Sequence, residues 1–405
     1  METYPKLIPL RESKYKDALF QEAGLLRYAK ISEIWDIPYS SQKLSYLTHS
    51  IFRFFGKFPP PIAKHLIDLY TKKGELILDP MCGSGTSAIE ALLNKRKIIC
   101  ADISPLSKLL VNIKCQYVSE KKLLKCLVDI NNKYRDKSFN HIRIKRIPLD
   151  KSKIDHWFLP STYKNLVKLL NIIIDINDEK LSMVFRGIFI SIIRKVSKAT
   201  SLQGRLFLDV CSAQENPIFE FNKAAEKIIK SIASLPYDFK PPAFIQEDMR
   251  KLSLKGQKPK LVICHPPYFN VYKFSSIFAL ELPWLMCDKK IVQAQEIREF
   301  FKVGRIENVH KYVLDMKDSI INIAIQLKKN SIFALMIGDT RIRSEYIPTT
   351  KLLLDSILPK CDIKLIKVAV RKPQFTEASW VASQRRTGKK VGTMISDFIL
   401  VFRKK

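Results

Sequence analysis

Two short motifs combine residue types that could bind a ligand and hold a reactive amine. "DPMCGSGT" at 79–86 and "HPPY" at 265–268 each follow a run of apolar residues. In the first motif, Gly83 and Gly85 let the backbone come close to a ligand, and a helix that starts here presents free N–H groups. In the second, an imidazole can accept a hydrogen bond while two prolines lock the backbone beside it. The glycine motif is neither a Walker loop nor G-x-G-x-x-G, so a purely structural turn is the alternative.

Carboxylates close the strands expected around the glycine motif. They are Asp79 after 76–79, Asp102 after 97–102 and Asp248 after 243–248. An acid about 20 residues beyond a glycine turn is placed to accept hydrogen bonds from ribose hydroxyls. A set of acids around one such turn predicts a site for a nucleoside with a cationic tail. The alternative is that each acid caps a helix.

The elements expected around these motifs belong to an α/β fold. A βαβ unit with a glycine-rich first turn is expected from strand 76–79, helix 87–96, strand 97–102 and a helix that begins at about Pro105. Later strands are expected at 243–248, 260–265, 331–339, 363–370 and 397–404, with helices such as 311–329 between them. We therefore predict a doubly wound, mostly parallel sheet.

A long helical stretch separates the two groups of strands. Its apolar residues recur with the i, i+3, i+4, i+7 spacing of amphipathic helices. A connection between neighbouring strands normally needs one helix and about 2 to 6 loop residues, so this stretch is predicted to be an inserted domain. The chain then divides into 1–105, the inserted helical domain 106–242, and 243–405.

Composition favours a polyanionic partner and argues against a membrane protein. The 405 residues include 70 Lys and Arg against 39 Asp and Glu, which gives a net charge of +31 spread along the chain. A lysine-rich host bias could explain part of this excess. No apolar run approaches the roughly 18 residues of a membrane span, and the N-terminus has no signal-peptide core, so we expect a cytoplasmic protein. The eight cysteines form no C-x-x-C pair, and we expect no metal site or disulfide framework.

With both motifs in this order, the chain resembles the S-adenosylmethionine-dependent DNA methyltransferases that modify exocyclic amino groups of adenine or cytosine. "DPMCGSGT" is similar to their cofactor motif D-P-F-x-G-S-G-T, and "HPPY" to their catalytic tetrapeptide, in which Asp, Asn or Ser precedes P-P-Y. Residues 54–70 resemble the segment that folds over the methionine of the cofactor. The resemblance covers 48–105 and 243–404, and it implies a Rossmann-like class I methyltransferase fold. The first half would bind the cofactor and the second would carry the catalytic motif.

The resemblance also implies the catalytic residues. His265 as a neutral imidazole and the carbonyl of Pro266 would accept hydrogen bonds from the target amino group, Pro267 would stiffen the motif, and Tyr268 would stack on the flipped base. As alternatives, the histidine could be a satisfied residue at a strand end and the tyrosine a core aromatic. Cys264 is no candidate nucleophile for cytosine C5 methylation, because that family uses a Pro-Cys dipeptide, which this chain lacks.

The cofactor site implied by the resemblance is larger. Asp79 would hold the methionine ammonium, Asp102 the ribose and Asp248 the adenine amino group. The full set expected to bind S-adenosylmethionine is Phe58, Asp79, Pro80, Cys82, Gly83, Gly85, Thr86, Asp102, Ile103, Asp248 and Met249. Asn270 and "GDTR" at 338–341, with Asp339 at a strand end, would border the active site; turn formation is their alternative.

Two residues depart from the family motifs: His265 replaces the usual Asp, Asn or Ser, and Met81 replaces the usual Phe. The first departure leaves adenine and cytosine both open, with adenine favoured as the commoner target. Candidates for contact with double-stranded DNA are the basic segments 143–148 and 193–205 and the stretch 371–392, which contains Trp380, Gln384, Arg385, Arg386, Lys389 and Lys390. A solvated face is the alternative for each.

The predicted function is site-specific DNA methylation at adenine N6 or cytosine N4, in a restriction-modification or defence system with a cognate restriction endonuclease as candidate partner. The alternatives are an RNA amino-methyltransferase and a catalytically inactive nucleic-acid-binding protein with the same fold.

Overall fold

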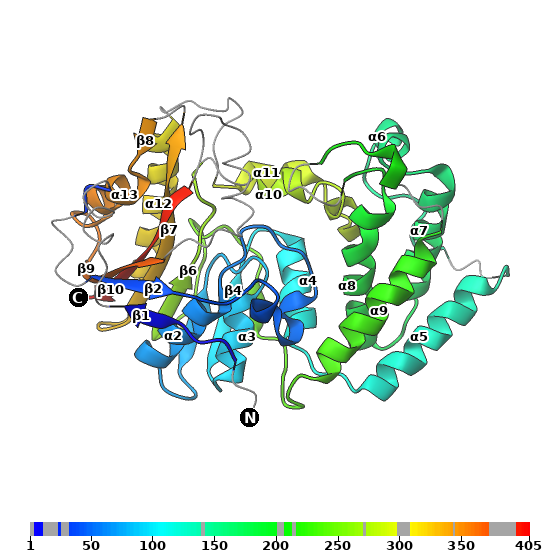
Figure 1. Ribbon diagram of the computed structural model, residues 1–405, viewed down its shortest axis with the longest axis horizontal. Coiled ribbons are helices and arrows are strands. Elements are labelled where there is room, and N and C mark those ends of the chain that lie inside the picture. The colour runs from blue at the N-terminus through cyan, green and yellow to red at the C-terminus, as the bar shows by residue number, and fades with distance from the viewer. Residues whose placement is uncertain are drawn as a thin grey trace.

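A ten-stranded mixed sheet forms one half of the molecule in the computed structural model, and a helical body forms the other (Figure 1). The structure describes residues 4–10, 23–25, 32–138, 142–200, 206–212, 216–269, 273–297, 308–342, 345–371 and 394–405. Across the sheet, the strands are β1 Ile8–Leu10, β2 Ser32–Asp36, β9 Ile363–Arg371, β10 Met394–Lys404, β7 Ile332–Ile342, β6 Leu261–Cys264, β3 Leu76–Asp79, β4 Lys97–Ala101 and β5 Ala243–Ile245. A further strand, β8 Glu345–Ile347, pairs with β7.

The centre of the sheet is parallel. Strands β7, β6, β3, β4 and β5 run in one direction, whereas β10 is antiparallel to both of its neighbours, β7 and β9. This arrangement confirms the predicted doubly wound, mostly parallel sheet of a class I methyltransferase-like fold. The sequence did not predict β1 and β2, which extend the sheet beyond β9. The strand expected at 243–248 ends at Ile245, so Asp248 lies in the loop beyond it.

Helices cover both faces of the sheet because strand side chains alternate between two cores. Ile77 packs with α2 Pro60–Tyr70 and α3 Thr86–Leu93 on one face. Leu78 packs on the other face with α12 Asn308–Ala324 and α13 Thr349–Ile357. Successive residues of a strand point to opposite faces, and burial on both explains the continuous apolar runs of these strands.

The helical body is built from the stretch predicted to be helical. Its helices are α5 Glu120–Arg135, α6 Lys151–Trp157, α7 Pro160–Ile174, α8 Glu179–Val196 and α9 Pro217–Ala233. They share one apolar core, which also includes Trp284 and other residues from 277–292. The periodic apolar faces seen in the sequence therefore pack against one another, as amphipathic helices must to bury those faces.

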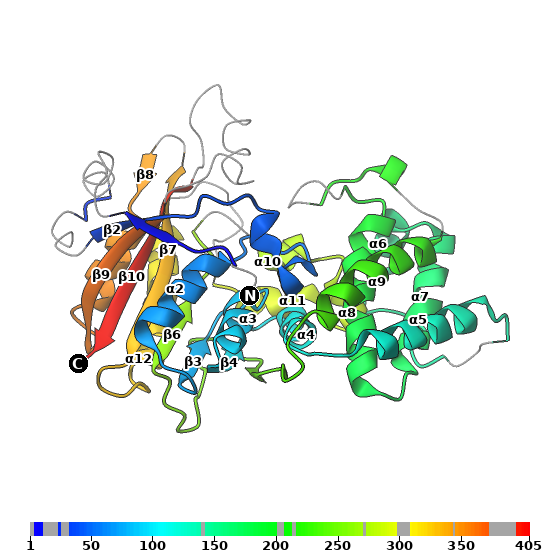
Figure 2. The same ribbon diagram turned by 60° about the horizontal axis from the view of Figure 1, so that its bottom comes forward.

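One helix, α4 Pro105–Lys114, belongs to both halves and lies between them in both views (Figures 1 and 2). Val111 packs in the core under the sheet, whereas Leu110 and Ile113 pack in the core of the helical body. The contact with α8 is close: a Cβ added at Gly187 would lie 2.4 Å from Cδ1 of Ile113. The domain boundaries drawn at 105 and 242 stay a prediction.

Shorter elements complete the described fold: the 3₁₀ helices η2 Lys43–Ser45, η3 Leu47–Ser50, η4 Val210–Ser212 and η5 Leu282–Leu285, and the helices α10 Phe274–Ile277 and α11 Lys289–Gln295. Within the part of the chain that the structure describes, no helix combines the length and the apolar character that a membrane span requires.

Candidate functional site

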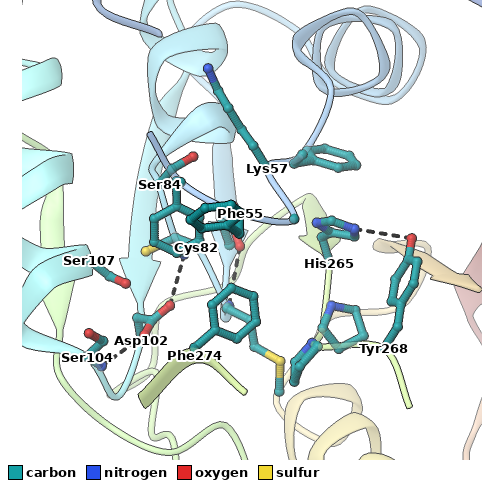
Figure 3. Close-up of a pocket in the computed structure, with 18 of the residues that line it drawn as sticks. Phe55, Lys57, Cys82, Ser84, Asp102, Ser104, Ser107, His265, Tyr268 and Phe274 are labelled. Atoms are coloured by element: carbon teal, nitrogen blue, oxygen red, sulfur yellow. Dashed lines mark hydrogen bonds between the residues drawn. The ribbon is translucent and has the colours of Figure 1, made fainter. Parts of the chain in front are cut away.

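A cavity of about 590 Å³ opens at the carboxyl ends of β3, β4 and β6 (Figure 3). All four residues of "HPPY" line it, and so do nine of the eleven residues expected to bind the cofactor: Phe58, Asp79, Pro80, Cys82, Gly83, Asp102, Ile103, Asp248 and Met249. Asp102 and His265 lie on opposite sides of this space in the close-up, with the ring of Phe274 between them. The two sequence motifs, nearly two hundred residues apart, therefore open into a single cavity.

The turn after β3 has the backbone conformation for which glycine is needed. Gly83 and Gly85 have φ angles of 47° and 78°, in the left-handed region that side chains disfavour. Gly85 immediately precedes α3, and a Cβ on it would lie 3.0 Å from Cγ2 of Val111. Neither Gly85 nor Thr86, which is buried at the start of α3, is among the lining residues. These two residues therefore belong to the turn and the start of α3 but not to the surface of the cavity.

Asp102 ties two turns together at the edge of the cavity. Its Oδ2 accepts a hydrogen bond from the Gly83 N–H at 2.9 Å, and its Oδ1 accepts one from the Ser104 N–H at 2.9 Å. Burial raises the pKa of this carboxyl, and hydrogen bonds from the backbone of Ser104, Gly83 and Ile103 and from the Ser107 side chain partly offset that rise. Asp102 is only half-buried and lines the cavity, so its oxygens remain accessible to ligand hydroxyls.

Asp79 places a buried acid beneath the same turn. Its side chain is 5% exposed, and its Oδ1 accepts only a long hydrogen bond, 3.3 Å, from the Met81 N–H. Burial raises the pKa of Asp79 to about 7. A carboxyl in this setting is stabilised in its charged form by a nearby cation.

Asp248 has a salt-bridge partner that the sequence analysis did not identify. The Arg250 Nε lies 3.0 Å from Oδ1 and 2.9 Å from Oδ2 of this carboxylate, and Nη1 of the same arginine contacts Asp315 at 2.9 Å. Asp248 still lines the cavity. Its expected contact with an adenine amino group stays a prediction.

The "HPPY" segment follows β6 directly and is held from two sides. Tyr268 is 9% exposed, and its hydroxyl lies 3.2 Å from Nε2 of His265, with the two rings perpendicular. The Tyr312 hydroxyl on α12 donates a hydrogen bond to the Pro267 carbonyl at 2.8 Å. Phe58 lies against the imidazole, with ring centroids 5.2 Å apart. The segment is therefore fixed by contacts from the N-terminal segment and from α12.

Electrostatics keep the imidazole neutral. Burial, with a smaller effect from the Arg371 guanidinium, lowers the pKa of His265 to about 3. At neutral pH the ring therefore has one protonated nitrogen and one nitrogen that can accept a hydrogen bond. Burial also raises the pKa of Tyr268, and the charge of Asp397 raises it further, so the phenol stays protonated.

An ion pair on the wall of the cavity was not predicted from the sequence. Arg371, the last residue of β9, lies opposite Asp397 of β10 in the strand register. The Arg371 Nε contacts Asp397 Oδ2 at 2.6 Å, both residues are buried, and both line the cavity. Arg371 directly follows the strand predicted at 363–370 and opens the basic stretch 371–392, and Asp397 begins the strand predicted at 397–404; neither signal indicates that the two residues pair.

The N-terminal segment that resembled the methionine-covering part of the family lines the opposite wall. Phe54 forms an aromatic cluster with Phe274 and Phe278, at centroid distances of 5.6 and 5.0 Å. Lys57 donates a hydrogen bond to the His49 carbonyl at 2.6 Å, and burial lowers the pKa of Lys57 to about 8. None of these contacts was predicted: the aromatic cluster joins segments distant in the sequence, and the Lys57 hydrogen bond joins residues eight positions apart in a segment without periodic structure.

The segment is anchored on α3. His49 Nε2 lies 2.9 Å from Oε1 of Glu90, and the Tyr46 hydroxyl donates to the same oxygen. Burial raises the pKa of Glu90 to about 7. Glu90 does not line the cavity.

Other expected residues lie elsewhere. Asp339, expected to border the active site, does not line the cavity: it accepts hydrogen bonds from the Tyr346 hydroxyl at 2.5 Å and the Thr350 N–H at 2.7 Å. Lys145 and Arg146, in the basic segment 143–148, are exposed. Asn270, residues 201–205 and nearly all of the stretch 371–392, including Trp380, Gln384, Arg385, Arg386, Lys389 and Lys390, lie outside the described residues.

Comparison with known proteins supports the class of protein that the fold and cavity define. Residues 7–111 match the family model described as DNA methylase. Type II methyltransferase M.MvaI of Kocuria varians is 27% identical over 168 residues, which are 40% of this chain and 37% of that protein. Type II methyltransferase M.BsoBI of Geobacillus stearothermophilus is 25% identical over 327 residues, 72% of this chain and 62% of that protein.

These matches confirm the resemblance to DNA amino-methyltransferases, although the chain spans less than two thirds of the length of both relatives. Among solved structures, the rRNA methyltransferase aviRa of Streptomyces viridochromogenes is 13% identical, with a TM-score of 0.32 over 86% of this chain and 85% of that one. A likeness at that TM-score carries no argument about the substrate.

Proposed function

We propose that this protein is a site-specific DNA methyltransferase. It transfers a methyl group from S-adenosylmethionine to the exocyclic amino group, adenine N6 or cytosine N4, of a base flipped out of the duplex. The observation that carries the proposal is that the glycine turn and the "HPPY" segment line one cavity of about 590 Å³. The family model described as DNA methylase supports DNA rather than RNA as the substrate.

The residues present fit the cofactor. The buried carboxyl of Asp79 lacks a cationic partner among the hydrogen bonds and ion pairs of the described residues, so it suits the methionine ammonium. Asp102 offers its accessible oxygens to the ribose, and Gly83 allows the backbone to approach the ligand. When bound, the cofactor supplies an electrophilic methyl group on a sulfonium sulfur.

The "HPPY" segment suits the amino group of the target base. A base amino group is a poor nucleophile because its lone pair is delocalised into the ring. Acceptors that hold both N–H groups favour a pyramidal nitrogen, and we assign these roles to the neutral His265 imidazole and the Pro266 carbonyl. The cofactor would supply the methyl group, and the amino nitrogen held by these two acceptors would give up one proton to water as it becomes methylated. Tyr268 stacks on the flipped base.

The finer features of the proposal concern the target and the partners. His265 leaves both bases open, with adenine favoured as the commoner target. The net charge of +31 suits a duplex DNA partner. The relatives are type II methyltransferases by name, so we propose that a cognate restriction endonuclease accompanies this protein.

The test uses purified protein, methyl-labelled S-adenosylmethionine, and DNA from a host that lacks DNA methyltransferases, with tRNA and rRNA in parallel. Labelled N6-methyladenine or N4-methylcytosine in digested DNA is the expected result and identifies the base. Long-read sequencing of DNA from a host that expresses the protein gives the recognition site. Transfer to RNA alone, or cofactor binding without transfer to either nucleic acid, overturns the proposal.

A further inference from the structure

Four side chains that line the cavity form two contacting pairs: Arg371 with Asp397, and Tyr268 with His265. We call these four residues the row. Arg371 contacts only one oxygen of the carboxylate, with Nε and Nη2 at 2.6 and 2.5 Å from Oδ2 of Asp397. The other oxygen, Oδ1, has no hydrogen-bond partner among the described residues, although Asp397 is only 1% exposed. A buried carboxylate oxygen without a donor is costly, so this atom requires an explanation.

Tyr268, which lines the same cavity, can supply that donor. The Asp397 charge raises the pKa of this phenol, and the same hydroxyl lies 3.2 Å from Nε2 of His265. A tyrosine hydroxyl has one proton, and here two acceptors compete for it: a neutral imidazole nitrogen and an ionised carboxylate. Hydrogen bonds to an ionised acceptor are roughly twice as strong as neutral ones. The proton therefore points to Asp397, and the phenolic oxygen accepts a hydrogen bond from the imidazole.

This choice decides which histidine nitrogen carries the proton. If Nε2–H donates to Tyr268, Nδ1 of the neutral ring keeps a free lone pair. In the opposite arrangement Tyr268 donates to Nε2, so Nδ1 carries the proton and becomes a donor. Only the first arrangement leaves His265 able to accept a hydrogen bond from an amino group.

We propose that Asp397, held by Arg371, is a positioning residue that acts through Tyr268 to fix His265 with its proton on Nε2, so that Nδ1 is the acceptor for the target amino group. The assignment of the proton stands on the two contacting pairs and on the Asp397 charge beside Tyr268; the role toward the amino group rests on the proposed function.

The row also accounts for a histidine where the resembling family has Asp, Asn or Ser. The oxygen of an Asp or Asn side chain accepts a hydrogen bond whatever its surroundings, whereas a neutral histidine offers an acceptor on a given nitrogen in only one of two tautomers. A histidine at this position therefore needs a second residue to select the tautomer. Asp397 is the charged group that can do so.

The first test reads the tautomer without activity. In protein labelled with ¹⁵N in its histidine rings, the signals of His265 are assigned by their loss in His265→Asn. We expect a protonated Nε2 and a bare Nδ1 in the wild type, and movement of the proton to Nδ1 in Asp397→Asn. Tyr268→Phe, which removes only the hydroxyl, should also release the fixed tautomer, and it serves if Asp397→Asn does not fold.

A matched control comes from β7. Asp339 is likewise a buried acid that accepts a hydrogen bond from a tyrosine, but it does not line the cavity. Asp339→Asn should leave the His265 signals unchanged. A wild-type His265 already protonated at Nδ1, or a tautomer that is the same in wild type and in both row variants, overturns the proposal.

The second test is a double-mutant cycle in methyl transfer to the DNA used above. In the wild-type background, Asp397→Asn should lower kcat about 10- to 100-fold, the factor for loss of a charged hydrogen bond, and leave the dissociation constant of the cofactor unchanged. In the His265→Asn background, whose amide oxygen is an acceptor in any case, the same change should cost less than about 3-fold.

An equal loss in both backgrounds assigns Asp397 a structural role only and overturns the proposal. If the wild type transfers no methyl group to DNA, the proposed function fails while the ¹⁵N measurement still decides the tautomer. The two failures are therefore distinguishable.

Discussion

The buried acid beneath the glycine turn should make cofactor binding depend on pH if it is the ammonium site. Asp79 has a pKa of about 7, raised from 3.8 by burial. If its carboxylate holds the methionine ammonium, the protonated form must lose its proton before the cofactor binds. The apparent dissociation constant should then rise, relative to its value above pH 8, about 2-fold at pH 7, about 10-fold at pH 6 and about 100-fold at pH 5.

Asp79 should also affect the stability of the cofactor-free protein, which should fall as pH rises, whereas cofactor affinity rises. The folded-state pKa lies above the unfolded value, so between about pH 4 and 7 the native state binds a proton that the unfolded chain does not. Stability without cofactor is therefore highest below this window and falls as pH rises through it. A shift of about three pKa units corresponds to a loss of about 4 kcal/mol in the free energy of unfolding. A bound ammonium should restore much of this lost stability, because it stabilises the ionised carboxylate.

Isothermal titration calorimetry from pH 5 to 8, in buffers with different ionisation enthalpies, measures both the affinity and the proton released on binding. Asp79→Asn should abolish the pH dependence. Glu90→Gln is the matched control, because Glu90 has the same raised pKa of about 7 but does not line the cavity, so the slope should persist. A slope that survives Asp79→Asn refutes the assignment of the ammonium site to this carboxyl.

Three further changes probe other parts of the cavity. Tyr268→Ala should lower turnover greatly with cofactor affinity nearly intact; unchanged turnover in single-turnover assays removes this ring from the mechanism. Asp102→Ala should raise the cofactor dissociation constant and free the N–H groups of Gly83 and Ser104, and an unaltered constant by calorimetry refutes the ribose role. Tyr312→Phe removes the donor to the Pro267 carbonyl; it should cost about 1 kcal/mol in denaturant unfolding and reduce kcat more than cofactor affinity, whereas a pure affinity loss contradicts this.

The sequence predicted the local parts of the site well. The strand at 76–79 matches β3 residue for residue, and the turn after it needs the left-handed glycines that the motif suggested. Both signals are local: a strand of apolar residues, then a glycine-rich turn that opens a helix. The "HPPY" motif was also identified from a local signal, because its four residues are contiguous and directly follow a run of apolar residues.

The parts that the sequence missed depend on register and on distant partners. Strand β2 joins the sheet by pairing with β9, where Lys367 of β9 contacts Glu33 of β2 across 334 positions, and no local pattern signals such a distant pairing. Arg371 and Asp397 meet only because two antiparallel strands align them. Asp339 was expected at a strand end, but β7 continues to Ile342, and the acid binds α13 instead.

The close fit on two opposite faces of α4 has a thermodynamic consequence. Val111 lies against Gly85 in the glycine turn, and Ile113, about half a turn further along α4, lies against Gly187 in the helical body. With so little free space at either contact, a movement of the helical body that carries α4 with it should displace the turn. A ligand that shifts this body must then alter cofactor affinity, and the cofactor must alter affinity for that ligand by the same factor.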